Sequence, residues 1–387
     1  MKKILFIGDN WFGDLGGRKK IVLSLINYLA DKYNVFLLTI DTKIKKSEIK
    51  NINQDLKENI KIIPYFFKRN WAFYFKLFFL FGREIFKIKP DLIICFGGGP
   101  HSNAFFFFIA KIFYPFSRVI FIEQGNTRAL YSKQNKFVKK LTACAFKKVD
   151  LIISASKEAA EDVSSLFGNK KVNFVYNFID LEKINTLKQE KVDESIFNQK
   201  KPIVLSVARL DLNQKDFLTL IKAFSIVIKE IDAYLVIVGE GPDRDKIEKY
   251  IEEIKLDDKI FLLGHKTNPY KYMKNSSVFV LSSFHEGMPI VLVEALACEV
   301  PVVATDCNFG PRELLNNGEY GILVPLRNYE KMAEAIKKLL IDKTLSNQFI
   351  TKGKQRILSF TKNESLKKYE QIIDGFIFNN NENRLNF

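Results

Sequence analysis

The sequence predicts an α/β protein built from two parallel, doubly wound sheets, and three observations support this fold class. Short apolar, β-branched runs such as 4–7, 91–96 and 119–123 are each followed by a polar loop and a helical pattern. The alternation pauses in the polar segment 181–200 and restarts at Ile203. A chain of 387 residues is also long for one core. We therefore expect an N-terminal domain over 1–185, a C-terminal domain over 186–362, and a final helix with a polar tail over 363–387.

The composition describes a globular protein whose basic charge is unevenly distributed. Hydrophobic residues make up 47% of the chain, and the net charge is +16. Residues 1–190 hold 32 Lys/Arg and 17 Asp/Glu, whereas the remainder is almost neutral. This asymmetry predicts an anionic partner for the N-terminal half. The four cysteines lack metal-ligand spacing and indicate reduced thiols in a cytosolic protein.

The segment 65–90 combines large aromatic side chains with cations that include Lys68, Arg69 and Lys76. It is charged too often to cross a bilayer, but a basic aromatic helix can lie in the membrane interface. Packing of such a helix on the domain's own sheet is the alternative. A second basic run covers 133–148. The first apolar run is too short for a signal peptide, so we expect a cytoplasmic protein. From the basic aromatic segments we expect it to be peripheral on the inner face of the cytoplasmic membrane.

Two loops of the N-terminal half have the composition of ligand-binding loops. Gly16 and Gly17 precede an amphipathic helix, and a glycine pair at such a turn allows a phosphate to approach the backbone. The spacing is not that of the dinucleotide fingerprint. His101 follows the glycines of 97–99, although a lone histidine is more often structural. FFFF at 105–108 predicts either a core helix or part of a membrane-facing surface.

Two cations follow the first strand of the second half. Arg209 and Lys215 are six residues apart in a loop that we expect to be exposed. Arginine can bind a diphosphate there through two hydrogen bonds, and lysine can bind it as a point charge. Either cation alone would more often be a solvated surface residue. Beyond a glycine turn, Asp243 and Asp245 mimic an Asp-x-Asp metal motif. We expect them to favour a helix N-terminus instead, and we expect no metal site.

The stretch 282–297, SSFHEGMPIVLVEALA, is the most informative part of the sequence. An apolar strand ends in a polar loop, and Pro289 lies where the next helix takes its first residue. Free backbone N–H groups and the positive end of a helix dipole suit an anionic or hydroxyl-rich ligand. Glu286 lies in the loop. Glu294 lies inside an apolar helix, where a carboxylate is rare unless something hydrogen-bonds it.

The pattern S-x-x-E-G-M-P-x-V-L-x-E-A-L-A-C, followed by PVVATD and GPRELL, resembles the donor-binding signature of the retaining glycosyltransferases of family four. The resemblance covers nearly the whole chain and is strongest over 203–325. It implies the GT-B fold, in which two Rossmann-like doubly wound domains face each other across a cleft. It also implies that the final helix crosses back to the N-terminal domain.

The same resemblance implies roles for individual residues. Glu286 would hold hydroxyls of the donor sugar beside the anomeric carbon, and Glu294 would bind the ribose diol. Arg209 and Lys215 would form the pyrophosphate clamp. Gln124 stands where the family usually has a histidine, and it cannot share the proton chemistry of imidazole. Further contacts are expected from the donor loop (Gly287, Met288, Pro289), from the nucleotide-side turn at Gly239, and from Gly16 and Gly17 on the donor phosphates or the acceptor.

We therefore expect a retaining, metal-independent hexosyltransferase that uses no cofactor. It would move a hexosyl or N-acetylhexosaminyl unit from a nucleoside diphosphate sugar, UDP-linked, to a lipid-linked or polysaccharide acceptor of bacterial lipopolysaccharide, capsule or O-antigen. The expected partners are this donor, this acceptor and an anionic membrane surface, with no nucleic acid. A sugar-nucleotide epimerase or phosphorylase of the same fold would need acid/base side chains or a cofactor lysine that the sequence does not display. A basic nucleic-acid-binding module is disfavoured by the intact donor signature in the neutral half.

Overall fold

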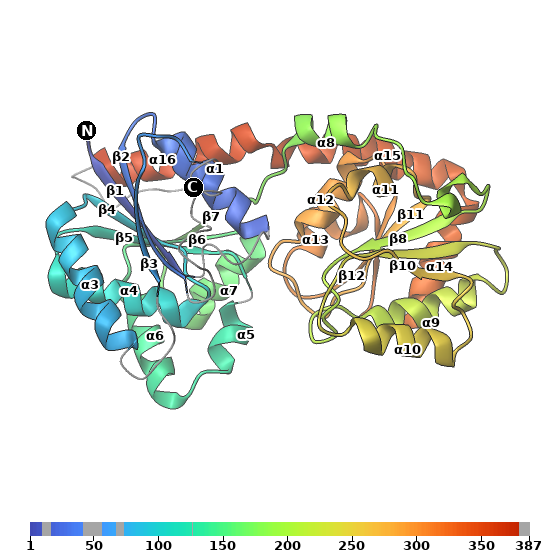
Figure 1. Cartoon of the computed structure of the whole chain (residues 1–387), viewed down its shortest axis with the longest axis horizontal. Helices are drawn as coiled ribbons and strands as arrows, with labels where there is room; N and C mark the ends of the chain where they lie inside the picture. Colours follow the sequence, from blue (N-terminus) through green and yellow to red (C-terminus); the bar gives the residue numbers. More distant parts are fainter. Residues whose placement is uncertain (10–16, 42–55, 67–72, 126, 379–387) are drawn as a thin grey trace. The chain divides into compact units, whose positions relative to one another are not determined.

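This computed structural model describes residues 1–9, 17–41, 56–66, 73–125 and 127–378, and these form two compact units. Unit 1 consists of Met1–Asn177 together with the chain from Asn363 onward, and unit 2 consists of Phe178–Lys362. The predicted division at residue 185 lies within helix α8 (Leu181–Leu187) of unit 2. Each unit contains one parallel sheet flanked by helices (Figure 1), which confirms the predicted fold class. None of the helices in the described ranges is long and apolar enough to cross a membrane.

The sheet of unit 1 has the strand order β3-β2-β1-β4-β5-β6-β7, and all its neighbours pair in parallel. Its central strands are covered on both faces, which explains why their sequences are continuous apolar runs. The strands are β1 (Lys3–Asp9), β2 (Asn34–Asp41), β3 (Lys61–Phe66), β4 (Leu92–Cys95), β5 (Arg118–Glu123), β6 (Leu151–Ser154) and β7 (Val172–Phe174).

Strand β3 is an element that the sequence analysis missed. We expected the basic aromatic segment from residue 65 onward to be helical, but Tyr65 lies in β3 at the edge of the sheet. Pro64 masked the strand pattern, because proline lacks the N–H that a central strand must donate and is tolerated at an edge. The basic aromatic helix begins only at Phe73.

Two groups of helices cover unit 1 (Figure 1). The four phenylalanines 105–108 lie in α4, and Phe106 and Phe107 are buried in a core shared with the sheet, so the core-helix expectation is confirmed. The C-terminal helix α16 belongs to unit 1. There, Glu370 accepts hydrogen bonds from Tyr28 of α1 (2.8 Å) and from Lys32, which follows α1 (3.0 Å). The helices are α1 (Gly17–Leu29), α3 (Phe73–Ile88), α4 (Pro100–Phe113), α5 (Thr127–Ser132), α6 (Lys136–Lys148), α7 (Lys157–Phe167) and α16 (Lys362–Phe378).

The sheet of unit 2 has the order β10-β9-β8-β11-β12-β13 and is also parallel. Strand β8 lies in the middle, with β9 on one side and β11 on the other, so the direction of winding reverses between β8 and β11. The strands are β8 (Ile203–Val207), β9 (Tyr234–Val238), β10 (Ile260–Leu262), β11 (Val278–Leu281), β12 (Val302–Thr305) and β13 (Ile322–Val324).

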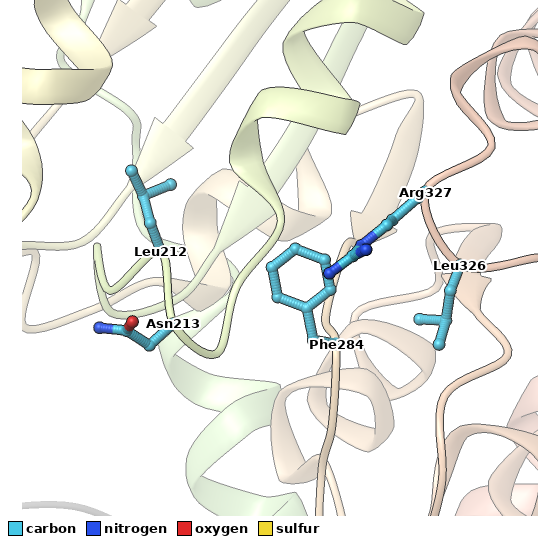
Figure 2. Close-up of a pocket in the computed structure, with 5 residues that line it drawn as sticks. All are labelled: Leu212, Asn213, Phe284, Leu326 and Arg327. Atoms are coloured by element: carbon cyan, nitrogen blue, oxygen red, sulfur yellow. The ribbon is translucent and has the colours of Figure 1, made fainter.

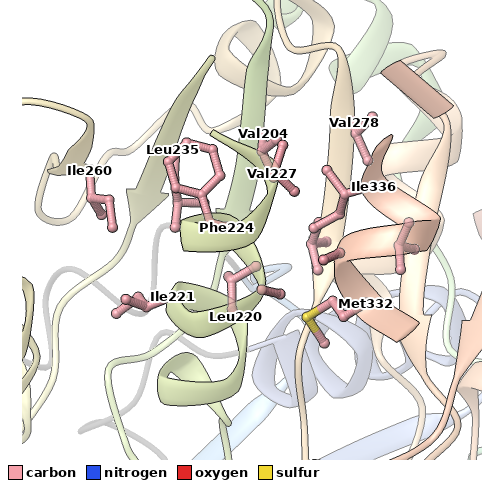
Figure 3. Close-up of a cluster of buried hydrophobic side chains, with 14 of the residues drawn as sticks. Val204, Leu220, Ile221, Phe224, Val227, Leu235, Ile260, Val278, Met332 and Ile336 are labelled. Atoms are coloured by element: carbon pink, nitrogen blue, oxygen red, sulfur yellow. The ribbon is translucent and has the colours of Figure 1, made fainter. Parts of the chain in front are cut away.

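The core of unit 2 fixes the position of this sheet. Helices α9 and α14 pack against each other and against the strands (Figure 3), with Phe224, Met332 and Ile336 fully buried among Val204 and Val278. The remaining helices are α8, α9 (Phe217–Val227), α10 (Arg244–Glu253), α11 (Tyr270–Lys274), α12 (Ile290–Ala297), α13 (Pro311–Leu314), α14 (Tyr329–Ile341) and α15 (Lys343–Arg356), with short 3-10 turns at Ser195–Asn198, Asn316–Gly318 and Ile357–Phe360.

Phe224→Ala should destabilise unit 2 by about 3–5 kcal/mol, because it leaves a cavity in a close-packed core. Leu218→Ala on the same helix is the matched control, since Leu218 is exposed and its truncation should cost less than about 1 kcal/mol. Urea unfolding of the two variants measures the difference. Equal destabilisation by both would contradict the packing described here.

Candidate functional site

The site is built where the winding of the unit 2 sheet reverses, which is the place where open α/β sheets bind ligands beyond the carboxyl ends of their strands. Two loops meet there, 208–216 after β8 and 282–289 after β11. Lys215 and Ser283 form an antiparallel backbone bridge between the loops. The Phe284 N–H donates to the Gln214 carbonyl (2.9 Å), and the Asp216 N–H donates to the Ser282 carbonyl (2.9 Å). Backbone hydrogen bonds therefore hold the two loops together.

A buried ion pair joins the side chains of these loops. The Lys215 ammonium donates to Glu286 Oε1, and the Ser283 hydroxyl donates to the same oxygen at 2.7 Å. Lys215 Nζ also lies 3.3 Å from Ser283 Oγ. Lys215, Glu286 and Ser283 are 8%, 7% and 0% exposed, respectively. Charges removed from water in this way are tolerated only when they are paired and hydrogen-bonded, so the three side chains act as one cluster.

This burial corrects one expectation. We predicted that Arg209 and Lys215 both lie on an exposed loop, but Arg209 alone is exposed. Lys215 is covered because the backbone bridge to Ser283 draws it beneath the 282–289 loop. The two predicted clamp cations thus share a loop and differ in environment, one paired and buried and the other open to solvent.

The end of β12 and the loop that follows it support the 282–289 loop. Thr305, fully buried, accepts from the Ser283 N–H (2.9 Å) and donates to the Ser283 carbonyl (2.8 Å). His285 forms a parallel bridge with Asn308. Sequence reasoning noted the PVVATD run that contains Thr305 but gave this residue no role.

Two glycines are required because other backbone segments approach them closely. Gly239, at the end of β9, has φ +150°, and a Cβ there would collide with the Ala208 carbonyl. Gly310 has φ +99°, and its Cβ would lie 2.5 Å from Pro289 Cδ. A side chain at either position would displace a site loop. The predicted loop residues Met288 and Pro289 are both buried against this support, and Gly287 is half-buried.

Glu294 has the hydrogen-bond partner that its apolar helix requires. It lies in α12, and the hydroxyl of Tyr270 in α11 donates to its Oε1 at 2.9 Å. Burial, followed by the neighbouring carboxylate, raises the pKa of Tyr270. The phenol therefore stays protonated and keeps donating. Sequence reasoning did not identify Tyr270, because its distance along the chain gives no signal of the contact.

Asp243 shapes the loop after β8. Its carboxylate accepts from Lys246 Nζ (2.6 Å) and from the Leu212 N–H (2.9 Å), and the same two contacts lower its pKa. Asp245 is exposed on α10. Within the described ranges, no group of three or more His, Cys, Asp or Glu side chains is arranged to hold a metal ion.

A shallow cavity of about 620 Å³ opens at the same edge of the sheet (Figure 2). The loops after β8, β11 and β13 contribute its lining, and the Arg327 guanidinium lies 5.2 Å from the centre of the Phe284 ring. A cation held over an aromatic wall suits an anionic or polar group of a ligand. Sequence reasoning missed this cavity, since its lining comes from three distant segments: Leu212, Asn213, Phe284, Leu326 and Arg327.

The other predicted residues lie in unit 1. Gly17 is the first residue of α1, and Gly16 lies outside the described residues. Gln124 is half-buried directly after β5. It follows Glu123, a buried carboxylate that accepts from Asn103 (2.5 Å) and Thr127 (2.8 Å). The structure thus brings together Lys215 and Glu286 within unit 2, and it places Gly17 and Gln124 in the other unit.

Comparisons with known proteins cover both units. The model of Glycosyltransferase Family 4 matches residues 15–183, and that of Glycosyl transferases group 1 matches 188–356. An N-acetylgalactosamine-N,N'-diacetylbacillosaminyl-diphospho-undecaprenol 4-alpha-N-acetylgalactosaminyltransferase of Campylobacter jejuni is 33% identical over 359 residues, which are 90% of this chain and 93% of that protein. An amylovoran biosynthesis glycosyltransferase of Erwinia amylovora is 25% identical over 97% of this chain and 100% of its own length.

Solved structures show the same architecture at lower identity. Anabaena HepE in complex with UDP superposes with a TM-score of 0.77 at 16% identity, covering 97% of this chain and 100% of that one. A sucrose-phosphate synthase of Thermosynechococcus elongatus gives a TM-score of 0.77 at 20% identity, with coverages of 96% and 98%. At these identities the likeness concerns the fold alone.

Lys215→Met should lower the free energy of unfolding of unit 2 by about 3–5 kcal/mol, because it leaves the Glu286 carboxylate buried without its counter-charge. The double variant Lys215→Met/Glu286→Gln should recover part of this loss. Lys331→Met is the control, because Lys331 pairs with Glu334 at the solvent-exposed surface and such pairs contribute little to the free energy of unfolding. If urea unfolding shows the single and double variants equally stable, the two side chains are not coupled.

Proposed function

Since the chain belongs to the family 4 glycosyltransferases of the GT-B fold, we propose that it transfers a hexosyl or N-acetylhexosaminyl unit from a UDP-sugar to a lipid-linked acceptor. The acceptor would be an intermediate of a bacterial surface glycan. The observation that carries this proposal is the buried Lys215–Glu286 pair at the reversal point of the unit 2 sheet, with exposed Arg209 in the same loop. This arrangement offers cations for a diphosphate and a carboxylate for sugar hydroxyls.

The choice of donor and acceptor is supported by the relatives. HepE structures hold UDP, UDP with glucose, and UDP-glucose. The Campylobacter relative transfers N-acetylgalactosamine to a diphospho-undecaprenol-linked acceptor, and a Staphylococcus aureus relative is a poly(ribitol-phosphate) alpha-N-acetylglucosaminyltransferase. A uridine nucleotide and a polyprenyl-diphosphate-linked sugar are therefore the substrates that we propose for this chain.

In the proposed mechanism, charge stabilisation is the main catalytic effect. Arg209 and Lys215 would neutralise the charge that grows on the leaving diphosphate, and Glu286 would orient the sugar through its hydroxyls. Glu294, held by Tyr270, would accept from the ribose hydroxyls. The bond from the anomeric carbon to the phosphate oxygen breaks, and a bond to the acceptor oxygen forms on the same face. The departing phosphate takes the acceptor's proton. Because the new bond forms on the face that the leaving group vacates, the anomeric configuration is retained, and the proposed step uses no metal or cofactor.

The direct test is transfer of label into lipid. The full chain, radiolabelled UDP-hexoses or UDP-N-acetylhexosamines, and an undecaprenyl-diphosphate-linked saccharide should give organic-phase label, including in the presence of EDTA. The product should keep the anomeric configuration of the donor. Absence of label with every UDP-sugar would overturn the proposed function, and an inverted product would overturn the mechanism.

Substitution of each carboxylate alone should distinguish the role of Glu294 in nucleotide binding from the role of Glu286 in sugar transfer. Glu294→Gln should weaken the binding of free UDP, because it removes an acceptor for the ribose. Glu286→Gln should leave UDP binding near the wild-type value and lower sugar transfer by about 10²–10³-fold, since it acts on the transition state. Calorimetric titration with UDP and initial rates of transfer measure the two effects, and Glu253→Gln on the surface of α10 is the control. Equal loss of UDP binding in both site variants would refute this division.

A further inference from the structure

Three helices of unit 1 form a continuous outer layer over one face of its sheet. Helices α3, α4 and α6 pack side by side in that order and contribute to a single core cluster with the strands (Figure 1). We call these three helices, with the turn 114–116 that follows α4, the outer helix layer. Its inner side is part of the core. Its outer side carries side chains that take no part in the site of unit 2.

The outer side of α3 is a stripe of phenylalanines. Phe75, Phe79 and Phe86 are 68%, 51% and 60% exposed. At 3.6 residues per turn, positions separated by four and by eleven fall within about 40° of one another around the helix axis. Leu77 and Phe81, which are buried, lie on the opposite side. The stripe therefore points away from the core, although phenylalanine is a residue that monomers normally bury.

The apolar surface continues from α3 onto α4. The rings of Phe75 and Phe79 meet edge to face at 4.8 Å, and Phe78 lies 5.3 Å from Phe79 and 5.2 Å from Phe113 of α4. Past this contact, α4 and its following turn expose two further large apolar side chains, Ile112 (61%) and Phe116 (85%). An exposed apolar area that spans two helices marks an interaction surface rather than scattered side chains.

Helix α6 repeats this combination and adds charge. Phe137 is 73% exposed and Leu141 is 40% exposed, four residues apart on one side of the helix. Lys136 and Lys140 alternate with them in the sequence and are also outside the core of the unit. On α3, Lys76 and Lys87 are exposed directly after Phe75 and Phe86 in the chain.

The acids of this part of the chain do not balance these cations. Residues 73–149 contain three acids, Glu84, Asp91 and Glu123. Glu84 pairs with Arg83 at 2.8 Å, Asp91 with Lys2 at 2.9 Å, and Glu123 is buried. In the described part of the outer helix layer, every exposed acid is therefore paired with a cation. A second copy of this surface would bring lysine against lysine, so the complementary partner is anionic.

We propose that the outer helix layer docks on an anionic lipid bilayer, with Phe75, Phe79 and Phe86 inserted at the boundary between headgroups and acyl chains. Lysines beside the stripe would lie at the level of the lipid phosphates, with their stems along the apolar surface. The aliphatic members, Ile112 and Leu141, favour hydrocarbon over nucleic acid, because they offer no ring to stack on a base. The inference deepens the proposed function, since a lipid-linked acceptor resides in such a bilayer.

Two contributions of different physical origin follow from this surface. The attraction between lysines and anionic lipid weakens as salt is added, because counter-ions screen it. The insertion of phenylalanine depends on removal of apolar area from water and is not screened. Binding should therefore fall with rising salt to a plateau above zero, and the plateau should belong to the aromatic stripe.

Vesicle flotation of the full chain tests the inference. Wild type should float with vesicles of phosphatidylethanolamine and phosphatidylglycerol, and it should float poorly with phosphatidylcholine. Phe75→Ser/Phe79→Ser/Phe86→Ser should weaken binding at least about tenfold and abolish the high-salt plateau. Lys76→Glu/Lys87→Glu/Lys140→Glu should weaken binding at low salt by about 100-fold and leave the plateau. All six positions are exposed, and an unchanged far-ultraviolet circular dichroism spectrum and thermal unfolding midpoint verify that each variant is folded.

Matched controls come from unit 2, where exposed side chains of the same kinds occur outside this layer. Leu218→Ser/Ile341→Ser/Leu358→Ser and Lys222→Glu/Lys229→Glu/Lys343→Glu should float like wild type. Failure of wild type to float with anionic vesicles at low salt would overturn the inference. So would flotation of the phenylalanine variant at the wild-type level, or tighter binding of wild type to a single-stranded nucleic-acid probe than to anionic vesicles.

The outcome is separable from that of the proposed function. Glu286→Gln should float like wild type although it transfers poorly. Flotation without any sugar transfer would contradict the proposed function alone. Transfer to the lipid-linked acceptor dispersed in detergent, without flotation of the protein on anionic vesicles, would contradict the membrane inference alone.

Discussion

The buried ion pair between Lys215 and Glu286 is the constraint around which unit 2 is arranged. Both charges are out of water, so they require each other and the Ser283 hydroxyl, and this requirement holds the loops after β8 and β11 together. Thr305, at the end of the next strand, fixes Ser283 through two backbone hydrogen bonds. The sheet brings these strand ends to one edge, and the site is therefore preorganised by the same contacts that stabilise the fold.

Preorganisation of this kind fits a ligand that carries both negative charge and hydroxyl groups. Such a ligand can interact with a lysine and a carboxylate at once, while Arg209 adds a charge that is not buried. Cations that are already in place need little reorganisation as charge develops during a reaction. The basic excess of the chain lies elsewhere, in unit 1, where phenylalanines and lysines share the outer helix layer. The two units thus present different chemistry, a polar site in one and an amphipathic surface in the other.

The sequence was sufficient for the fold class and for part of the site. Apolar runs followed by helical patterns predicted both sheets, and the periodicity after Asn363 predicted α16. Strand β3 was missed because Pro64 interrupts its pattern and its edge position is visible only in three dimensions. Spacing placed Lys215 and Glu286 near two strand ends, but it carried no information about the burial of Lys215. The Tyr270 contact with Glu294 was likewise invisible, because it joins two helices through tertiary packing.

A crystal structure of the chain with intact UDP-hexose tests the central claim most directly. The account predicts the diphosphate within hydrogen-bond distance of Arg209 and Lys215, sugar hydroxyls on Glu286, and the ribose on Glu294. It also predicts that the loops after β8 and β11 remain bridged as they are here. A diphosphate bound away from both cations, or a sugar that makes no contact with Glu286, would contradict it.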